Sequence, residues 1–262
     1  MSLSLQLLFD IPAPGRSFTD LLKSLGYAPS LDFGGEVKDL RPPEGTTVLA
    51  LRYQEGVVMV GDRQATEGHQ VAHREIRKVF QADSYSAVAI AGTAGLAIEM
   101  VRLFQVELEH YEKIEGNRLS LEGKAAFLAR LVRSQLPMAF QGLVVVPLFA
   151  GFDELTNRGR LYTYDVVGGR YEENNFGSTG SGASLAKSYL RANFAEGMTS
   201  EQAVDIAVGA LVSAAQEDTA TGGPDLRRGI FPTVLLVDEI GVRELGNDEV
   251  RPAAERAVEK IR

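Results

Sequence analysis

The chain of 262 residues contains no cysteine and only three histidines. Without cysteine the protein has no disulfides, no thiolate metal ligands and no cysteine nucleophile. His69, His73 and His110 leave few candidates for a histidine-based triad or a multi-histidine metal site. We interpret His69 and His73 as surface residues, because no glutamate between them completes the H-E-x-x-H pattern of a metalloprotease. The sequence therefore predicts a protein without a metal site.

Basic residues and long apolar runs are also scarce. The 27 Lys and Arg residues against 35 Asp and Glu give a net charge of −8. Because nucleic acids and anionic membranes select basic surfaces, we expect neither as a partner. No apolar run approaches the length of a membrane span, and the first residues lack the basic region and cleavage site of a signal peptide. We therefore expect a cytoplasmic protein.

Residues 1–45 differ in composition and hydrophobic pattern from the rest of the chain. They hold five of its ten prolines, the pair Gly34-Gly35, and a weak amphipathic pattern that predicts a short helix over Ser17–Leu25. Such a segment is not expected to bury a core of its own. We interpret it as a tail, an assembly arm or a removable propeptide, followed by one domain over residues 46–262.

From residue 46 onward, blocks of strands alternate with pairs of helices. Strands are predicted over residues 46–53, 56–66, 78–83, 85–92, 143–153, 160–169 and 231–238. Helices are predicted over residues 95–115, from Ser120, over 183–194 and 200–217, and in the tail from Pro252. This order differs from the regular alternation of a βαβ fold. It predicts an α+β fold, a four-layer αββα sandwich of two largely antiparallel sheets with helices on both outer faces.

The motif Gly45-Thr46-Thr47-Val48 stands where the domain begins. Cleavage between Gly45 and Thr46 would join a hydroxyl nucleophile and a free α-amine in one residue, and the amine can serve as the base for that hydroxyl. Taken alone, the motif is better explained by a loop glycine before a threonine-rich strand. The residues that follow favour the nucleophile.

Two charged residues stand at the ends of predicted strands. Asp62 ends the second strand and Lys78 begins the third. An acid and a lysine so placed can pair across a sheet, and the fixed positive charge lowers the pKa of a neighbouring amine. A cross-strand ion pair is also a common structural feature that contributes little energy.

Three further segments carry candidate site residues. In the AIAGTAG turn, the N–H of Gly92 is a candidate oxyanion donor, or the glycine only closes the turn. The glycine-rich Phe176–Ser184 lacks the ending of a phosphate-binding loop, and a strand-to-helix turn that presents Ser181 is equally consistent. Asp218 and Thr221 lie at a helix C-terminus, where the helix dipole disfavours an acid, so Asp218 either has a specific partner or is simply solvated.

From Thr46 to about Leu245 the chain resembles the β subunit of the proteasome core particle, a threonine protease of the N-terminal-nucleophile (Ntn) hydrolase superfamily. The resemblance rests on an ordered set of motifs: GTTV, GDRQAT with Asp62 sixteen residues after Thr46, and Lys78 another sixteen residues on. AGTAG, GSGAS and DTATGGPD follow in that order. The long segment before Thr46 and the run TATGGPDLRRGIFPT are most similar to the actinobacterial type of β subunit.

The resemblance implies a role for each matching residue. Residues 1–45 would be a propeptide that the chain removes itself at Gly45–Thr46. The implied catalytic residues are Thr46, Asp62, Lys78, Gly92, Ser181, Asp218 and Thr221. The implied substrate-binding residues are Ala65, Thr66, Ile76, Phe80, Ile90, Ala94 and Ile98. Whether Lys78 relays a proton or acts only through its charge stays open.

The resemblance also implies the Ntn-hydrolase fold, no cofactor, and stacked seven-membered rings built with proteasome α subunits and other β subunits. An ATPase ring or other activator would dock on the α ring, and unfolded or tagged proteins would be the substrates. The alternatives are a non-proteolytic amide hydrolase of the same superfamily, a simpler bacterial ATP-dependent protease with almost no prosegment, and a catalytically silent ring subunit. A phosphate-binding module is a further, more distant alternative.

Overall fold

The computed structural model describes residues 46–67, 70–73 and 75–260. The predicted helix over Ser17–Leu25, the predicted propeptide over residues 1–45, and His69 lie outside the described residues. His73 is exposed, as the sequence predicts.

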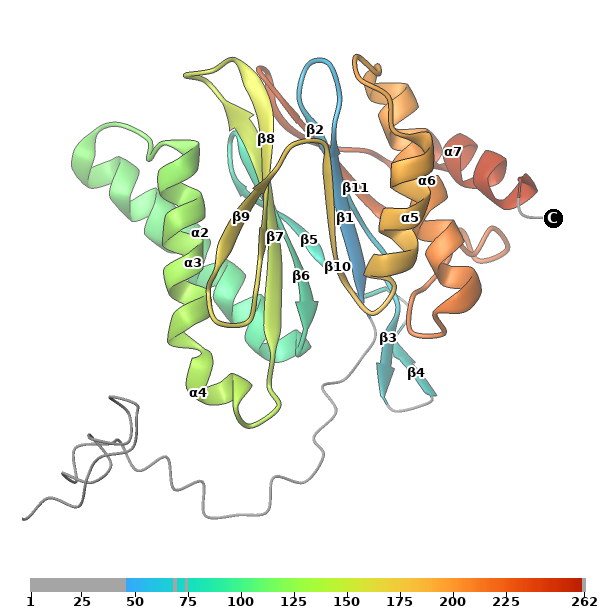
Figure 1. The fold of residues 1–262 in the computed structure, drawn as a ribbon, viewed down its shortest axis with the longest axis horizontal. Helices are drawn as coiled ribbons and strands as arrows, with labels where there is room; N and C mark the ends of the chain where they lie inside the picture. Colours follow the sequence, from blue (N-terminus) through green and yellow to red (C-terminus); the bar gives the residue numbers. More distant parts are fainter. Residues whose placement is uncertain (1–45, 68–69, 74, 261–262) are drawn as a thin grey trace, which may run out of the picture. The chain divides into compact units, whose positions relative to one another are not determined.

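One sheet has five strands in the order β10-β1-β2-β11-β12, and every neighbouring pair is antiparallel (Figure 1). Its strands are β10 (Phe176–Gly180), β1 (Thr47–Arg52), β2 (Val57–Gly61), β11 (Thr233–Asp238) and β12 (Gly241–Glu244). The central strands β1 and β2 are buried along nearly their whole length. Continuous apolar runs in place of alternation are typical of strands that are covered on both faces.

The second sheet has the order β5-β6-β7-β8-β9 and is also antiparallel throughout. Its strands are β5 (Val79–Asp83), β6 (Ser86–Gly92), β7 (Val145–Asp153), β8 (Arg158–Tyr164) and β9 (Arg170–Glu173). A separate hairpin, β3 (Ala65–Glu67) and β4 (Gln70–His73), follows β2. The single strand predicted over residues 56–66 is therefore divided, because β2 ends at Gly61 and the chain leaves the sheet.

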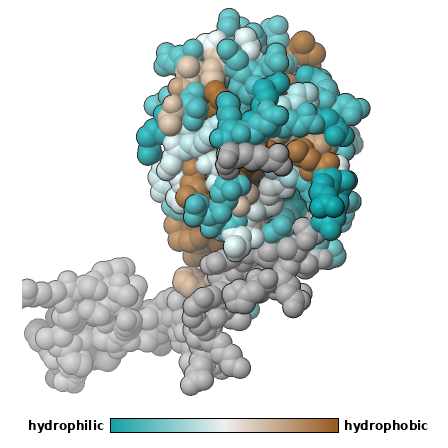
Figure 2. All heavy atoms as spheres, turned by 90° about the vertical axis from the view of Figure 1, so that its right-hand side faces the viewer, coloured by the Kyte–Doolittle hydropathy of each residue, from teal (hydrophilic) through white to brown (hydrophobic). Residues whose placement is uncertain are grey.

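Helices cover the outer faces of both sheets (Figure 1). On one side lie α2 (Ala94–Glu115) and α3 (Leu121–Ser134), with the short α4 (Leu136–Ala139) after them. On the other side lie α5 (Ala183–Asn193) and α6 (Ser200–Glu217), with α7 (Asn247–Glu259) packed against α6. The outer face on that side is mostly hydrophilic with scattered hydrophobic spots (Figure 2). Amphipathic helices that turn an apolar stripe toward a sheet produce such a surface.

The helix ends follow the local signals of the sequence. The Ser120 hydroxyl accepts a hydrogen bond from the N–H of Gly123 and begins α3, and Thr199 and Gln202 form a complete capping box before α6. The tail from Pro252 is helical as predicted, but the helix starts five residues earlier. α7 begins at Asn247 and continues through Pro252, because its apolar side, which includes Val250, is buried in the core.

Three apolar layers hold the four structural layers together. Between the two sheets lies a core that includes Val48, Met59 and Leu148, and a further core lies under the helices of each side. The predicted α+β fold, an αββα sandwich of two antiparallel sheets, is confirmed. In the part of the chain that the structure describes, no helix has the length and apolar character needed to cross a membrane.

Candidate active site

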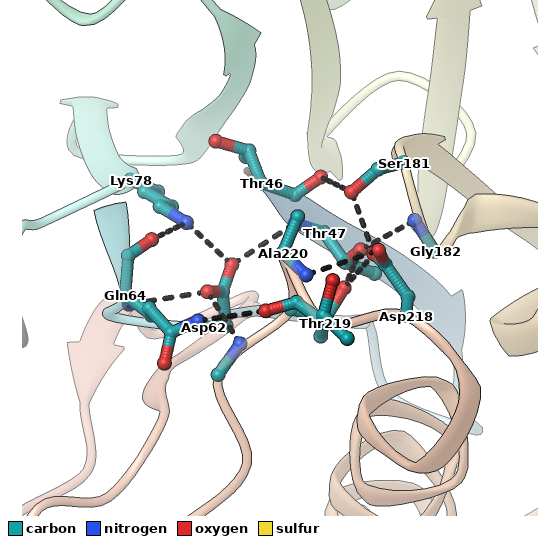
Figure 3. Close-up of polar contacts among 12 residues, drawn as sticks. Thr46, Thr47, Asp62, Gln64, Lys78, Ser181, Gly182, Asp218, Thr219 and Ala220 are labelled. Atoms are coloured by element: carbon teal, nitrogen blue, oxygen red, sulfur yellow. Dashed lines mark hydrogen bonds and ion pairs between the residues drawn. The ribbon is translucent and has the colours of Figure 1, made fainter. Parts of the chain in front are cut away.

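The pairing of β1 with its two neighbours brings the predicted site residues to one end of the first sheet. Val48 lies opposite Gly61 of β2, and Thr47 lies opposite Gly180 of β10. The residues that follow these two glycines, Asp62 and Ser181, therefore come to lie on either side of the start of β1. Figure 3 shows Asp62 and Ser181 flanking the Thr46-Thr47 segment.

Thr46 is held in place at the start of β1. It is only 8% exposed. Its carbonyl oxygen accepts a hydrogen bond of 3.0 Å from the N–H of Ser181, and the Ser181 hydroxyl oxygen lies 3.5 Å from it. The residue proposed as nucleophile is thus fixed against the turn that follows β10.

Asp62 and Lys78 form a buried ion pair beside Thr46. The Nζ atom of Lys78 lies 2.7 Å from Oδ1 of Asp62 and also donates to the carbonyl oxygen of Gln64. Burial raises the pKa of the Asp62 carboxyl, and the ammonium of Lys78 opposes that rise. Burial lowers the pKa of Lys78, and the carboxylate of Asp62 opposes that fall. Each charge therefore depends on the other for its ionisation. The predicted pairing of Asp62 with Lys78 is present, but it does not cross a single sheet as expected: Asp62 follows β2 and Lys78 precedes β5, which belong to different sheets, so the pair links the two sheets.

The Asp62 carboxylate is fixed by hydrogen bonds to both oxygens. Oδ1 accepts from Lys78 and from the backbone N–H of Thr47 at 2.9 Å, while Oδ2 accepts from the backbone N–H groups of Gln64 at 3.1 Å and Gly222 at 3.0 Å. Four donors leave the carboxylate little freedom to rotate. Asp62 therefore holds the lysine ammonium in a defined position.

A second polar cluster lies on the other side of Thr46. Asp218 caps the C-terminus of α6, and its Oδ2 atom accepts from the Ser181 hydroxyl at 2.6 Å (Figure 3). The same oxygen also accepts from the Thr221 hydroxyl. The N–H of Ala220 donates to Oδ1 of Asp218 at 3.1 Å. The specific partners of Asp218 are therefore the hydroxyls of Ser181 and Thr221.

The glycine-rich segment forms a strand and a turn. Phe176–Gly180 is β10, and Ser181 and Gly182 make the turn into α5. Of the two interpretations of this segment, the structure matches the strand-to-helix turn that presents Ser181.

The N–H of Gly92 points toward the same site. The N–H of Ile90 bonds the carbonyl oxygen of Lys78 at 3.0 Å, so alternate residues of β6 direct their N–H groups to the side of β5. Gly92 lies two residues after Ile90, so its N–H faces the same side of β6. At this position along the sheet, β6 extends past the first residue of β5. Gly92 also has a φ of +115°, and a Cβ there would lie 2.0 Å from the Val144 carbonyl oxygen. A residue with a side chain would not fit.

A cavity of about 80 Å³ opens next to Thr46. It is lined by Thr46, Ala65, Ile76, Arg77, Lys78, Phe80, Ile90, Gly92, Ala94, Ala97 and Ile98. Six of the predicted substrate-binding residues are among them, and Thr66 pairs with Val71 in the adjacent β3–β4 hairpin. Arg77 and Ala97 were not predicted. The Arg77 guanidinium is engaged by the Val79 carbonyl oxygen at 2.8 Å and the Glu244 carboxylate at 2.6 Å.

Several residues that complete the site were not predicted from the sequence. Thr47, Gln64, Gly182 and Gly222 bond or contact the predicted residues. The two adjacent glycines after Thr221 were the available signal, since a Cβ on Gly222 would lie 2.6 Å from the Cβ of Gln64. Thr47 gave no comparable signal.

Comparison with known proteins agrees with this geometry. The family model described as "Proteasome subunit" matches residues 43–225, well over half of the chain. This chain belongs to the proteasome subunit family. It is 53% identical over 220 residues to "Proteasome subunit beta" of Acidimicrobium ferrooxidans, an alignment that covers 84% of this chain and 81% of that protein.

Other proteasome β subunits are similarly close. The protein of the same name from Stackebrandtia nassauensis is 49% identical over 263 residues, with 95% of this chain and 93% of the relative covered. That of Jonesia denitrificans is 50% identical over 246 residues, with coverages of 92% and 81%. The chain is therefore a β-type subunit of the proteasome core, a family in which protease activity is expected. This membership favours the proteasome over the phosphate-binding module and over an amide hydrolase from elsewhere in the superfamily.

Proposed function

We propose that this proteasome subunit is a threonine-type endopeptidase with Thr46 as its nucleophile, formed as a zymogen whose residues 1–45 are a propeptide. The observation that supports this most strongly is the meeting of three features at Thr46. The buried Lys78–Asp62 pair lies on one side, the Ser181–Asp218–Thr221 cluster on the other, and a largely apolar cavity opens beside them.

Removal of the propeptide is proposed to use the same nucleophile as the mature enzyme, the Thr46 hydroxyl, at a stage when the Thr46 nitrogen is still an amide and cannot serve as its base. The Thr46 hydroxyl attacks the carbonyl carbon of Gly45, the acyl group shifts from the Thr46 nitrogen to its oxygen, and the α-amine is released. Water then hydrolyses the ester, which frees residues 1–45 with a new carboxylate at Gly45. Glycine before the cut leaves the attacked carbonyl uncrowded.

In the mature enzyme the Thr46 α-amine takes the proton of the Thr46 hydroxyl, and the oxygen attacks a peptide carbonyl of the substrate. The N–H of Gly92 stabilises the oxyanion. The amine then gives its proton to the leaving nitrogen, and water hydrolyses the acyl-enzyme. The reference pKa of an α-amine is about 7.7–8.0, so a modest reduction by the Lys78 charge makes it a neutral base at physiological pH.

The remaining residues are proposed to position these groups. Asp62 keeps Lys78 charged and oriented, because its carboxylate opposes the effect of burial. Ser181 and Asp218, supported by Thr221, hold the α-amine by hydrogen bonds. Lys78 supplies electrostatic bias or relays the proton.

The proposed setting follows the family. The subunit would act in stacked seven-membered rings with α subunits and other β subunits, in the cytoplasm, on unfolded or tagged proteins. An ATPase ring or other activator would dock on the α ring.

Replacement of Thr46 tests the proposal. Thr46→Ala removes the hydroxyl. When this variant is co-expressed with its α partner, particles should still assemble, but they should not hydrolyse peptides and their β chains should retain residues 1–45. Thr46→Ser keeps the hydroxyl and should retain measurable turnover. Wild-type turnover in assembled Thr46→Ala particles would show that another group is the nucleophile.

A further inference from the structure

The side chain of Thr47 is completely buried, although the residue adjoins the proposed nucleophile. Its hydroxyl oxygen accepts a hydrogen bond of 2.9 Å from the N–H of Gly182 and lies 2.6 Å from Oγ1 of Thr221. Its backbone N–H donates to Oδ1 of Asp62 at 2.9 Å. Thr47 is therefore bonded to both polar clusters that flank Thr46.

The directions of these hydrogen bonds are determined by their partners. The Thr221 hydroxyl donates its one proton to Oδ2 of Asp218, a carboxylate oxygen that can only accept. In the contact between Thr47 and Thr221 the Thr47 hydroxyl must therefore be the donor. The resulting chain runs from the Gly182 N–H through Thr47 and Thr221 to Asp218, and the same Oδ2 atom accepts from the Ser181 hydroxyl.

The turn at Ser181 and Gly182 is shaped around these oxygens. A Cβ on Gly182 would lie 2.6 Å from Oγ1 of Thr47 and 2.7 Å from Oγ1 of Thr221, so the absent side chain leaves the space that the two hydroxyls occupy. The preceding N–H, of Ser181, bonds the Thr46 carbonyl oxygen at 3.0 Å. Two successive N–H groups thus attach the turn to Thr46 and Thr47.

We propose that Thr47 is a positioning residue for the reaction at Thr46, an inference that rests on the function proposed above. Its hydroxyl directs the Thr221 proton toward Asp218 and anchors the turn that carries Ser181, while its backbone N–H anchors Asp62. Without the hydroxyl, the Thr221 hydroxyl is free to turn away from Asp218 and the Gly182 N–H loses its acceptor. Ser181 and Asp218 then lose their fixed position relative to Thr46.

Two substitutions of Thr47 separate the hydroxyl from the shape of the side chain. Thr47→Val keeps the branched shape and removes the hydroxyl, whereas Thr47→Ser keeps the hydroxyl. The matched control is Ser178→Ala on β10. Ser178 is buried, and its hydroxyl donates to the Val48 carbonyl oxygen of β1 at 2.8 Å, outside the cluster. Both Thr47→Val and Ser178→Ala therefore remove a buried hydroxyl from the same pair of strands.

Peptide hydrolysis by full-length chains assembled with their α partner gives the readout. Because small displacements of reacting groups are costly, Thr47→Val should lower kcat by roughly 10- to 100-fold. Its KM should stay within about twofold, since the substrate cavity is untouched. Thr47→Ser and Ser178→Ala should both keep kcat within about threefold of wild type. Propeptide removal, followed by intact mass, should be slowed by Thr47→Val and not by Thr47→Ser.

The outcomes distinguish this inference from the proposed function. Wild-type kcat in Thr47→Val, with Thr46→Ala inactive, overturns the positioning role alone. Activity in Thr46→Ala overturns the proposed function itself. Equal losses in Thr47→Val and Ser178→Ala assign the Thr47 hydroxyl to stability and also overturn the positioning role. If Thr47→Val does not assemble, Thr47→Ala is measured in its place. Failure of both to assemble, while Ser178→Ala assembles, assigns the hydroxyl to folding and overturns the positioning role as well.

Discussion

The Nζ atom of Lys78 lies 2.7 Å from Oδ1 of Asp62, and both side chains are almost completely removed from solvent. The Asp62 carboxylate is held by backbone N–H groups that include those of Thr47 and Gly222. A buried ion pair adds little net stability compared with apolar residues, but removal of one partner leaves an uncompensated charge. The arrangement therefore serves to hold a positive charge at a defined place beside Thr46.

Lys78→Ala should lower kcat/KM for peptide hydrolysis by roughly 10²–10⁴-fold, because the α-amine base loses its organising charge. Lys78→Arg should not restore activity, because the guanidinium is planar, larger and differently hydrated. Near wild-type turnover of Lys78→Ala would mean that the lysine is only structural.

The chain offers a matched control for Lys78. Lys124 of α3 is equally buried and forms an ion pair of 2.5 Å with Asp83, away from the active-site residues. Lys78→Ala and Lys124→Ala should both lower the melting temperature, since each removes the cation that pairs with an acid, the buried Asp62 or the partly buried Asp83. Only Lys78→Ala should reduce turnover in particles that assemble.

The Lys78–Asp62 ion pair should determine the alkaline limb of the pH profile of kcat. Burial lowers the pKa of Lys78. The loss of kcat at alkaline pH should therefore have its midpoint below about pH 10.4, the ordinary pKa of lysine. The acidic limb reports the Thr46 α-amine, which must be neutral to act as a base. Asp62→Asn removes the carboxylate that opposes burial, so the pKa of Lys78 falls further and the alkaline limb moves to lower pH. A limb that stays in place or moves upward would contradict the coupling.

The sequence predicted the elements that carry strong local signals. Apolar runs around the Gln54-Glu55-Gly56 turn located β1 and β2, and the capping box at Thr199 located the start of α6. The short strands β4, β9 and β12 were missed, because four residues give little periodicity. Leu103 and Tyr111 fitted the helical spacing of α2, yet both are exposed.

The site was also predictable only in part, because some of its residues are linked by contacts between distant parts of the chain. Asp62 and Lys78 were conspicuous as charges at the ends of apolar strands. Thr47 was not, because its hydroxyl partners Gly182 and Thr221 lie 135 and 174 residues away and a threonine in a strand needs no explanation. Its role depends on tertiary contacts that no local pattern records.

The cavity beside Thr46 predicts a preference for apolar residues before the cut. Of its charged lining residues, Arg77 is already bonded to Val79 and Glu244, and Lys78 is paired with Asp62; the other walls, such as Ile76 and Ile90, carry no charge. Burial of an unpaired charge costs far more than burial of an apolar group. Peptides ending in Leu, Tyr or Phe should be cut at least roughly tenfold faster than those ending in Arg or Glu, equivalent to about 1.4 kcal/mol. Equal rates for all classes would mean that these residues do not line the substrate pocket.

A charge introduced at the mouth of the cavity tests the same assignment. Ile98 lines the cavity and is 38% exposed. Ile98→Glu should raise the relative rate for peptides ending in Arg, because the new carboxylate can pair with the guanidinium. Ile98→Gln has a similar size without the charge and should leave the ratio of Arg to Leu cleavage unchanged. An equal change in both variants would indicate an effect of shape.

Assembly should be visible in the native mass. Family membership predicts that the chain, co-expressed with its α partner, forms particles many times heavier than the 28.4 kDa subunit. Native mass spectrometry with a parallel peptidase assay measures both properties together. A stable and active monomer would argue against a ring-shaped protease and for an amide hydrolase.

The N-terminal residue of assembled, active particles tests the proposed mechanism most directly. Thr46 can use its own α-amine as a base only after the bond to Gly45 has been cut. Intact-mass analysis or N-terminal sequencing should therefore find Thr46 as the first residue of the β chain in wild-type particles, whereas the β chain of Thr46→Ala particles should keep the segment before position 46. Active wild-type particles whose β chains all still carry the segment before Thr46 would contradict the N-terminal threonine mechanism.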